Sequence, residues 1–245
     1  MIRFARWAAL LLMLSTLVAA PLRPASAQDD AQAQLDATAA AMLALKSFHF
    51  QLDTTVGSTA FQEVFELKTV SGDIVRPSDF QAKVEVKLAI VTVTLEVIGV
   101  DGAIWVKNPI GGDDSFIQVT GDGSEFSLPP LVFLNPDSLV SGALQSLDDP
   151  VVAGTEELNG QQTTVITGTF SPAKLLGSGT PIAELGSFTP STKTLDVKAW
   201  IDDQNRLVRI DFSGPLFGFE EGSGELVRSI TLSNFDADVT ITPPA

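Results

Sequence analysis

The sequence predicts an α+β, mainly β domain in which about ten antiparallel strands form one strongly curved sheet. Segments of alternating polar and apolar residues follow one another along most of the chain. Turn residues separate these segments, and helical patterns occur only at the start and in the middle. Because so many antiparallel strands tend to curl or close, we expect a half-barrel whose helices cover the open side.

Residues 1–27 have the three-part pattern of a secretion signal. Two arginines precede an apolar stretch from Trp7 to Ala20, and Ala25-Ser26-Ala27 forms a small-residue ending. The apolar stretch is shorter than the roughly 20 residues that a membrane-spanning helix needs. We therefore expect cleavage after Ala27 and a single exported domain over residues 28–245. An uncleaved signal that acts as an anchor is the alternative.

The composition is acidic and contains no cysteine. Cleavage after Ala27 would remove three arginines and no acid, which leaves 12 basic and 30 acidic side chains and a net charge of −18. Such a charge repels the phosphates of nucleic acid, so we expect no nucleic-acid partner. An exported chain without cysteine has no disulfides, so its stability must come from an ordinary hydrophobic core.

The first half of the mature chain predicts one helix followed by a series of strands. Residues 29–47 are rich in alanine and carry apolar residues at helical spacing, and from Phe48 the apolar period changes to two. Further strands are expected at 61–70, 80–88, 88–98, 103–107 and 116–119, with turns at 71–73 and 76–79. Residues 88–91 are apolar on both faces, so the sheet there is covered on both sides or lines an apolar space.

The middle of the chain combines an irregular apolar segment with a helix. Residues 126–134 are apolar but contain two prolines, which a central strand does not tolerate. Asn135-Pro136 then begins a helix that extends to about Leu147. The second half predicts a short helix at 171–176 and strands at 151–157, 161–170, 194–201, 206–212 and 229–241.

Residues suited to catalysis are scarce. The one histidine, His49, lies on the polar face of the first strand, and the chain has no nucleophile elbow and no phosphate-binding loop. A glycosidase would place two acids across a cleft, but the acid pairs of this chain fall in expected loops and are interpreted as solvated turn residues. These pairs are Asp113/Asp114, Asp148/Asp149, Asp202/Asp203 and Glu220/Glu221. Asp236-Ala237-Asp238 could contribute to calcium binding but lacks the spacing of an EF-hand loop. We predict no enzyme, no metal site and no cofactor.

The chain is instead rich in apolar side chains, with a positive mean hydropathy despite its charge. Two segments suit an apolar pocket with a movable cover: the two-faced segment 88–97, and the proline-containing segment 128–134 that precedes an amphipathic helix. On the residues alone, a core that is simply filled by these side chains explains the same pattern.

Five segments in order resemble the mycobacterial LppX/LprA/LprF/LprG lipoproteins. They are Ala44-Leu45-Lys46-Ser47-Phe48-His49-Phe50, Phe133-Leu134-Asn135-Pro136-Asp137-Ser138-Leu139, Leu158-Asn159-Gly160, Ala199-Trp200-Ile201-Asp202 and Leu207-Val208-Arg209-Ile210. The resemblance implies the fold of the carriers LolA and LolB, an antiparallel half-barrel around a hydrophobic cavity that holds lipid acyl chains. This family is typically anchored by a lipidated cysteine, which this chain lacks.

We therefore predict a carrier of lipid or acylated glycolipid that works in the cell envelope or outside the cell. We expect it to be a monomer without a cysteine-linked lipid, and transient contact with a membrane is left open. The predicted cavity lining is Val91, Val93, Leu95, Val97, Ile104, Val106, Leu131, Phe133, Leu139 and Leu144, with segment 128–134 and the strands at the opening as the gate. Two alternatives remain: a non-catalytic surface protein with a side-chain-filled core, and a secreted hydrolase that uses His49 or facing carboxylates.

Overall fold

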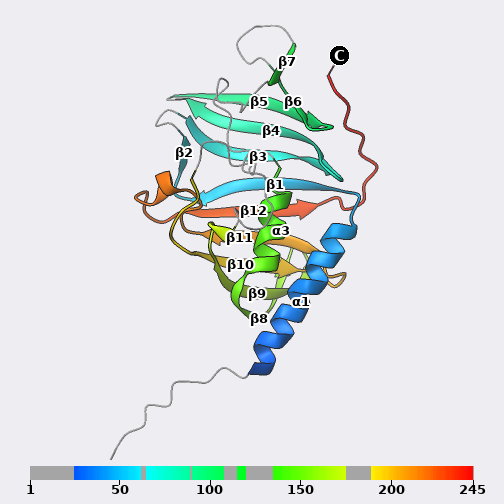
Figure 1. Ribbon diagram of the computed structural model, residues 1–245, viewed down its shortest axis with the longest axis vertical. Helices are drawn as coiled ribbons and strands as arrows, with labels where there is room; N and C mark the ends of the chain where they lie inside the picture. The colour runs from blue at the N-terminus through cyan, green and yellow to red at the C-terminus, as the bar shows by residue number, and fades with distance from the viewer. Residues whose placement is uncertain are drawn as a thin grey trace, which may run out of the picture.

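The structure is a computed structural model that describes residues 25–61, 65–88, 90–107, 115–119, 135–174 and 189–244 (Figure 1). Its helices are α1 (Ala25–Ala44), α3 (Asp137–Ser146) and the short 3-10 helix η2 (Gly218–Glu220). Its first seven strands are β1 (Ser47–Val56), β2 (Thr59–Phe61), β3 (Phe65–Val75), β4 (Asp79–Leu88), β5 (Val91–Val100), β6 (Ala103–Lys107) and β7 (Phe116–Val119). The other five are β8 (Asp148–Leu158), β9 (Gln161–Phe170), β10 (Leu195–Ile201), β11 (Leu207–Ser213) and β12 (Val227–Ser233).

All of these strands belong to one antiparallel sheet. Its order is β7-β6-β5-β4-β3-β1-β12-β11-β10-β9-β8, and β2 pairs with β3 off this path. β12 returns from the end of the chain to lie beside β1, which joins the two halves of the sequence. β7 and β8 are the two ends of the order and do not pair with each other, so the sheet is not closed. The mainly β, antiparallel prediction is confirmed.

One predicted turn, 71–73, is absent because these residues continue β3. Gly72 pairs with Phe50 of β1 and Ala82 of β4. A Cβ atom at position 72 would lie 2.0 Å from the carbonyl oxygen of Gln81. Glycine is therefore present because the backbones approach closely, and the chain turns only at the predicted second site, after Val75.

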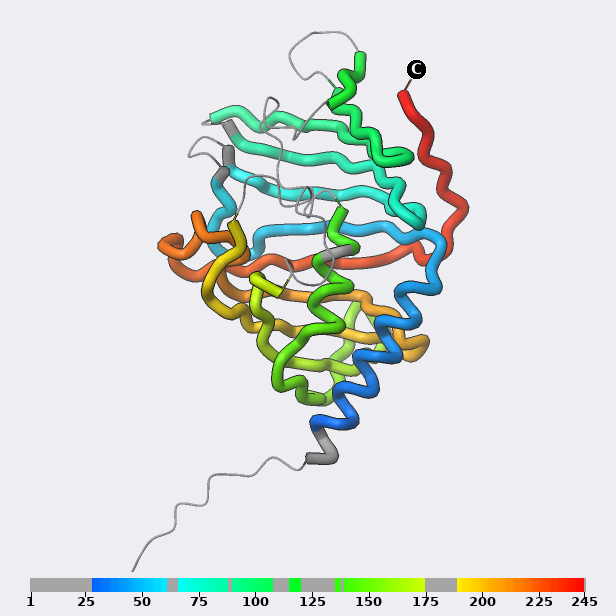
Figure 2. Tube along the Cα trace, in the orientation of Figure 1, coloured from blue at the N-terminus to red at the C-terminus, as the bar shows by residue number. Residues whose placement is uncertain are grey.

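The predicted final strand is shorter than expected, because β12 ends at Ser233. Asn234 and Asp236 have φ angles of 50° and 56°, a left-handed conformation that a strand cannot contain. The backbone N–H of Asp236 donates to the Ser47 carbonyl (2.9 Å), and its carboxylate accepts from the Lys46 N–H (2.7 Å). The remaining C-terminal residues run extended away from this point (Figure 2).

One face of the sheet is apolar across most of its width, and the strand register explains why. From β5 to β12, each of the following residues pairs with the next: Val97, Ala82, Gly72, Phe50 and Leu232. From β12 to β9, a second row of paired residues contains Ile230, Ile210, Ala199 and Ile166. Because side chains alternate along a strand, their i±2 neighbours share this face. We call it the inner face and its opposite the outer face.

The two α-helices lie over the inner face and complete the core (Figure 1). Leu35 and Met42 from α1, and Leu139 and Leu144 from α3, belong to one hydrophobic cluster with the inner-face side chains. α1 also contacts α3 and the end strand β8. The chain before β1 and the segment between β7 and β8 therefore supply the helical cover.

Ionic contacts fix both ends of α3. The Arg76 guanidinium, in the turn between β3 and β4, donates to both Asp137 carboxylate oxygens (2.8 and 2.9 Å) and to the Met42 carbonyl (3.0 Å). At the other end, Lys174 Nζ donates to the Ser146 carbonyl (3.0 Å) and contacts the Asp148 carboxylate (2.7 Å). Arg76 therefore ties α1, α3 and one end of the sheet together.

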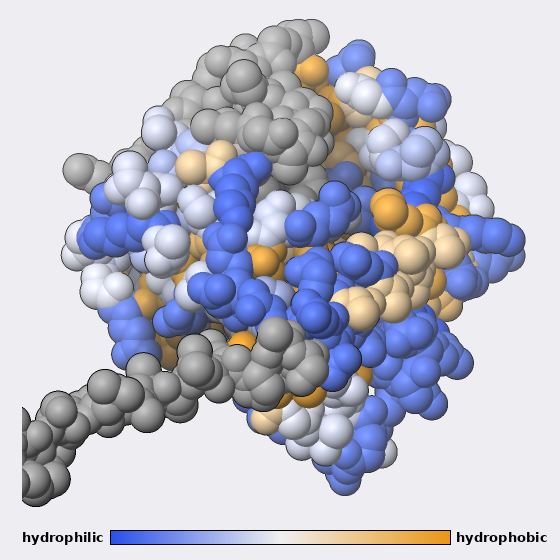
Figure 3. Space-filling view, turned by 60° about the horizontal axis from the view of Figure 1, so that its bottom comes forward, coloured by the Kyte–Doolittle hydropathy of each residue, from blue (hydrophilic) through white to orange (hydrophobic). Residues whose placement is uncertain are grey.

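Hydrophilic residues make up most of the surface seen from the α1 and β8 end of the molecule, with hydrophobic residues in patches between them (Figure 3). A helix long and apolar enough to cross a membrane does not occur among the described residues.

Candidate functional site

The candidate site is the part of the inner face that the helices cover incompletely. Near the middle of the sheet, Phe50, Leu52 and Ile230 are completely buried. On β5, β6 and β7 the cover is thinner, and four apolar residues that contact the core are only partly buried: Val93, Leu95, Ile104 and Val119. At the margin, Ile117 is 40% and Val91 56% exposed. One apolar surface thus continues from the dry core to solvent.

The structure places eight of the ten predicted lining residues on the inner face or in the core that it shares with α3. Four are buried in the core cluster: Val97, Val106, Leu139 and Leu144. Three are partly buried against it, namely Val93, Leu95 and Ile104, and Val91 lies further out on the same face. Leu131, Phe133 and the rest of the predicted gate 128–134 lie outside the described residues. Contact between these residues and a lipid remains a prediction.

Sequence reasoning omitted the β4 side chains that face the same region. Val84 pairs with Leu95, and Val86 pairs with Val93, so both stand beside the predicted lining. Both are almost completely buried. The signal was present, because β4 shows clear alternation and only a short turn separates it from β5. Pairing the two strands as a hairpin would have identified these residues.

A buried ion pair lies at one end of the inner face. Arg228 of β12 pairs with Thr54 and Phe212 across the neighbouring strands, and only 2% of its side chain is exposed. Its guanidinium donates to the Glu220 carboxylate and to the Thr59 hydroxyl (2.7 Å). Burial lowers the pKa of Arg228, while the Glu220 charge opposes this shift. An arginine still stays charged, so Glu220 balances a charge inside the core.

Two of the acids interpreted as solvated turn residues are in fact buried, so that interpretation is wrong for them. Glu220 also accepts hydrogen bonds from the backbone N–H groups of Leu216 (2.8 Å) and Phe217 (3.0 Å). Asp202 accepts from the N–H groups of Gln204 (2.9 Å) and Arg206 (2.7 Å). Each carboxylate satisfies the backbone donors of its own tight turn, which is why it is drawn inside. Asp113 and Asp114 lie outside the described residues.

His49 lies on the outer face, away from the apolar site. Its Nδ1 is 2.8 Å from the Asp73 carboxylate, whose other oxygen accepts from Gln81 (2.8 Å). These residues line a groove of about 460 Å³. Among the described residues, Asp73 is the only side chain that hydrogen-bonds to His49, so the nucleophile of a hydrolase is not brought to it.

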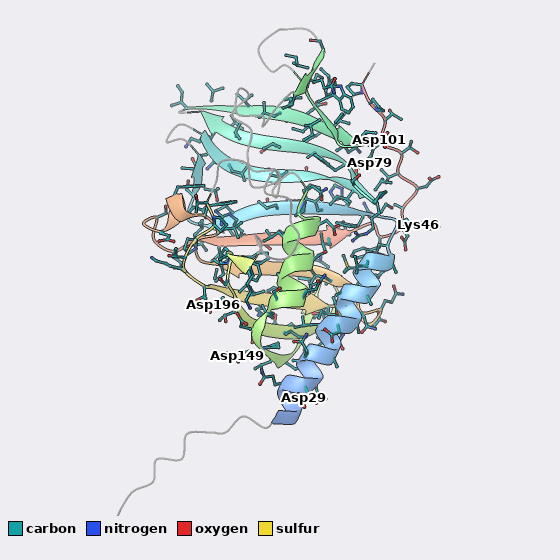
Figure 4. All side chains as sticks on the ribbon, viewed as in Figure 1. Asp29, Lys46, Asp79, Asp101, Asp149 and Asp196 are labelled. Atoms are coloured by element: carbon teal, nitrogen blue, oxygen red, sulfur yellow. The ribbon has the colours of Figure 1, made fainter. Side chains whose placement is uncertain are left out.

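A second outer-face groove, of about 480 Å³, is lined by Asp149, Asp196 and Lys198, among others. Figure 4 labels Asp149 and Asp196. Its lining mixes charged and apolar residues, and the described residues contain no cluster of three or more His, Cys, Asp or Glu side chains that could hold a metal. The chemistry of the inner face is therefore burial of apolar surface, whereas both outer grooves also contain charged side chains.

Comparison with known proteins connects this fold to solved structures. LprF from Mycobacterium bovis is similar with a TM-score of 0.61 and 22% identity, over 89% of this chain and 98% of LprF. The lipoprotein LppX from Mycobacterium tuberculosis is similar with a TM-score of 0.54 and 20% identity, over 87% of this chain and 99% of LppX. At these identities the likeness shows a shared fold.

A search of curated protein sequences found no match. The sequence model of the family described as LppX_LprAFG lipoprotein, however, matches residues 30–241. This match extends over nearly the whole chain after the predicted signal and includes most of α1, all of α3 and all strands of the sheet. The chain therefore belongs to the LppX_LprAFG lipoprotein family.

Proposed function

We propose that this protein binds lipid acyl chains on its inner face and carries lipid or acylated glycolipid within or across the cell envelope. In this proposal the sheet is the wall of a half-barrel, and α1 and α3 form part of its cover. The observation that carries the proposal is the gradient along one apolar face, from complete burial at β1 to partial exposure at β5–β7. An acyl chain lying on Val93, Leu95 and Ile104 would extend the core and remove both apolar surfaces from water.

Burial of an acyl chain supplies enough free energy for this function without any chemistry. Each methylene removed from water contributes about 0.8 kcal/mol, so a 16-carbon chain could contribute on the order of 12 kcal/mol. The loss of chain and protein freedom opposes this gain, and the remainder is the affinity. Family membership supports the same role, since the resemblance to LppX and LprF implies lipid carriage.

The lack of cysteine sets this chain apart from lipid-anchored relatives. We propose that it is released as a soluble carrier when residues 1–27 are removed during export. A carrier of this kind would shield its cargo through the aqueous part of the envelope. Its net charge of −18 after cleavage favours solubility in that compartment.

The proposal is tested by titrating delipidated protein with a fluorescent 16-carbon acyl probe. Val93→Trp should weaken probe binding by about tenfold or more, because the indole would occupy space on the inner face that the acyl chain needs. Thr94→Trp is the matched control, since Thr94 is the next residue of β5 and is exposed on the outer face. It should bind the probe like the wild type.

Two results would contradict the proposal. Equal probe binding by folded Val93→Trp and Thr94→Trp would show that Val93 does not face the ligand. Wild-type protein that takes up no probe would favour the other interpretation of the sequence, a surface protein whose core is filled by side chains.

A further inference from the structure

The exposed hydrophobic side chains of this protein are unevenly distributed. Seven large ones are exposed among the described residues. Three are scattered over α1, β7 and β8, namely Leu43, Ile117 and Val152. The other four are Val56, Ile90, Val91 and Phe219, which we call the apolar rim.

Strand register places the apolar rim along one side of the sheet, where β1 ends and β12 begins. Ile90 lies in the turn from β4 to β5, Val91 is the first residue of β5, and Val56 is the last residue of β1. Val56 pairs with Val227, the first residue of β12, and Phe219 belongs to η2 in the loop that leads into β12. The β4–β5 turn, β2 and η2 accordingly lie along the same side of the molecule, on the left in Figure 1.

The rim residues are unusual for their positions. Hairpin turns ordinarily carry glycine, asparagine or aspartate, yet Ile90 stands in this turn with 95% of its surface exposed. The Phe219 ring stacks on the buried Phe217 ring with a centroid distance of 5.5 Å and an interplanar angle of 6°. This contact holds Phe219 in place while 44% of the residue remains in water. Grouped apolar side chains of this kind mark a contact surface.

Two lysines lie beside the part of the rim at the β4–β5 turn. Lys68 and Lys87 lie near the rim ends of β3 and β4 and share Glu66 as their ion-pair partner (2.6 and 3.7 Å). The three side chains sum to a positive charge in a chain whose net charge is −15. Both lysine side chains are about two-fifths exposed, at 41% and 43%. Their long stems can hold the ammonium groups at the level of lipid head groups while neighbouring apolar residues insert deeper.

The rim is also continuous with the candidate site. Val91 is a rim residue, and it shares the inner face with Val93 and Leu95 further along β5. A membrane in contact with the rim would therefore lie next to the partly covered end of the apolar face. Acyl chains could pass between the two without crossing the polar outer face.

From these observations we propose that the apolar rim docks on a lipid bilayer with anionic head groups. Ile90, Val91 and Phe219 enter the interface, and Lys68 and Lys87 contact the head groups. The inference rests on the proposed function for its purpose, which is lipid exchange, but docking itself can be measured separately.

The test is co-sedimentation of the mature, delipidated protein with vesicles of phosphatidylcholine and phosphatidylglycerol. The double variant Ile90→Ser/Phe219→Ser should bind these vesicles about tenfold more weakly, because two inserting side chains are lost. Leu43→Ser is the matched control, since Leu43 on α1 is 56% exposed, as Val91 is, but lies away from the rim. Lys87→Glu should weaken binding to these vesicles but not to pure phosphatidylcholine vesicles, and high salt should remove this difference.

Soluble acyl probe separates this inference from the proposed function. The double variant Ile90→Ser/Phe219→Ser, here called the rim variant, should still bind free probe, because Val93 and the inner face are unchanged. Normal probe uptake together with equal vesicle binding by wild type, rim variant and Leu43→Ser would overturn docking and leave the carrier function standing. Vesicle binding without probe uptake by the wild type would instead remove the carrier function. A rim variant that turns a wild-type dimer into a monomer would show that a second copy covers the rim, which also overturns membrane docking.

Discussion

Arg228 shows how a single charged residue is accommodated on an apolar face. It occupies the same face as Ile230 and Leu232, where an unpaired charge would be very costly. Glu220 reaches it from η2, and the Thr59 hydroxyl accepts further hydrogen bonds from the guanidinium. The pair therefore holds the η2 loop against the end of the sheet.

Removal of one partner should destabilise the protein strongly. Glu220→Gln should lower the free energy of unfolding by about 3–5 kcal/mol, because the Arg228 charge would stay buried without its counter-charge. Denaturant unfolding monitored by circular dichroism measures this loss. Glu221→Gln is a control at the adjacent residue, which is partly exposed and whose carboxylate accepts hydrogen bonds from Ser191 and Thr192 but has no buried counter-charge, and it should cost clearly less. Equal losses of unfolding free energy in both variants would show that the buried Arg228–Glu220 pair does not stabilise the protein more than the surface contacts of Glu221 do.

Individual side chains were predicted from the sequence only where alternation is strong. The period of two along β5 placed Val93, Leu95 and Val97 together, as the register has them. The burial of Glu220 could not be predicted, because Thr59, which binds the same Arg228 guanidinium, lies far away in the sequence. Nothing local distinguishes Glu220 from a solvated loop acid.

At the scale of elements, α3 is held at both ends by ionic contacts that differ in reach. Lys174 contacts only the last residue of α3, Ser146, and the nearby Asp148 at the start of β8. Arg76, in the β3–β4 turn, contacts both α1 and α3. The Arg76 guanidinium also lies 5.8 Å from the centroid of the Phe48 ring. Arg76 is therefore the main link between the helical cover and the β3–β4 turn.

Replacing Arg76 should loosen the helices more than the sheet. Arg76→Met should reduce stability by about 2 kcal/mol, since hydrogen bonds to charged groups are worth about 1.5–3 kcal/mol each and solvent recovers part of the loss. Amide hydrogen exchange should become faster in α3 and at the end of α1, while β9 and β10 keep their protection.

Arg209→Met is the matched control for this experiment. Arg209 also makes a bidentate pair, with Asp211 at 2.8 Å through both contacts, but it lies on β11 and touches neither helix. Its loss should leave exchange in α3 unchanged. Faster exchange in α3 for both variants would mean that general destabilisation, and not the Arg76 contact, opens the cover.

Elements were predicted well where one period persisted and poorly where the chain changes conformation. The helix near 137–146 and the strands from β4 to β6 follow directly from their patterns. Gly72 resembled a turn residue in sequence, and only the neighbouring strands β1 and β4 reveal the close approach that requires it. Likewise, alternation after Ser233 suggested a longer strand, but Asn234 and Asp236 adopt left-handed backbone and end it.

At the scale of the molecule, an open sheet must avoid pairing with other chains at its ends. β8 has features that hinder such pairing: Pro150, two irregularities in register and the acidic pair Glu156 and Glu157. These features agree with the expectation of a monomer. The sequence predicted a many-stranded curled sheet, but the pairing of β1 with β12 and the uneven helical cover depend on long-range packing that no local pattern contains.

The most direct test of the whole account is native mass spectrometry of protein secreted from a bacterial host. The account predicts the mass of residues 28–245 plus about one bound lipid, which organic extraction would release for identification. It also predicts that Val93→Trp, secreted and folded in the same way, carries clearly less lipid. Wild-type protein that is free of lipid and takes up none when glycolipid is added would contradict the carrier function.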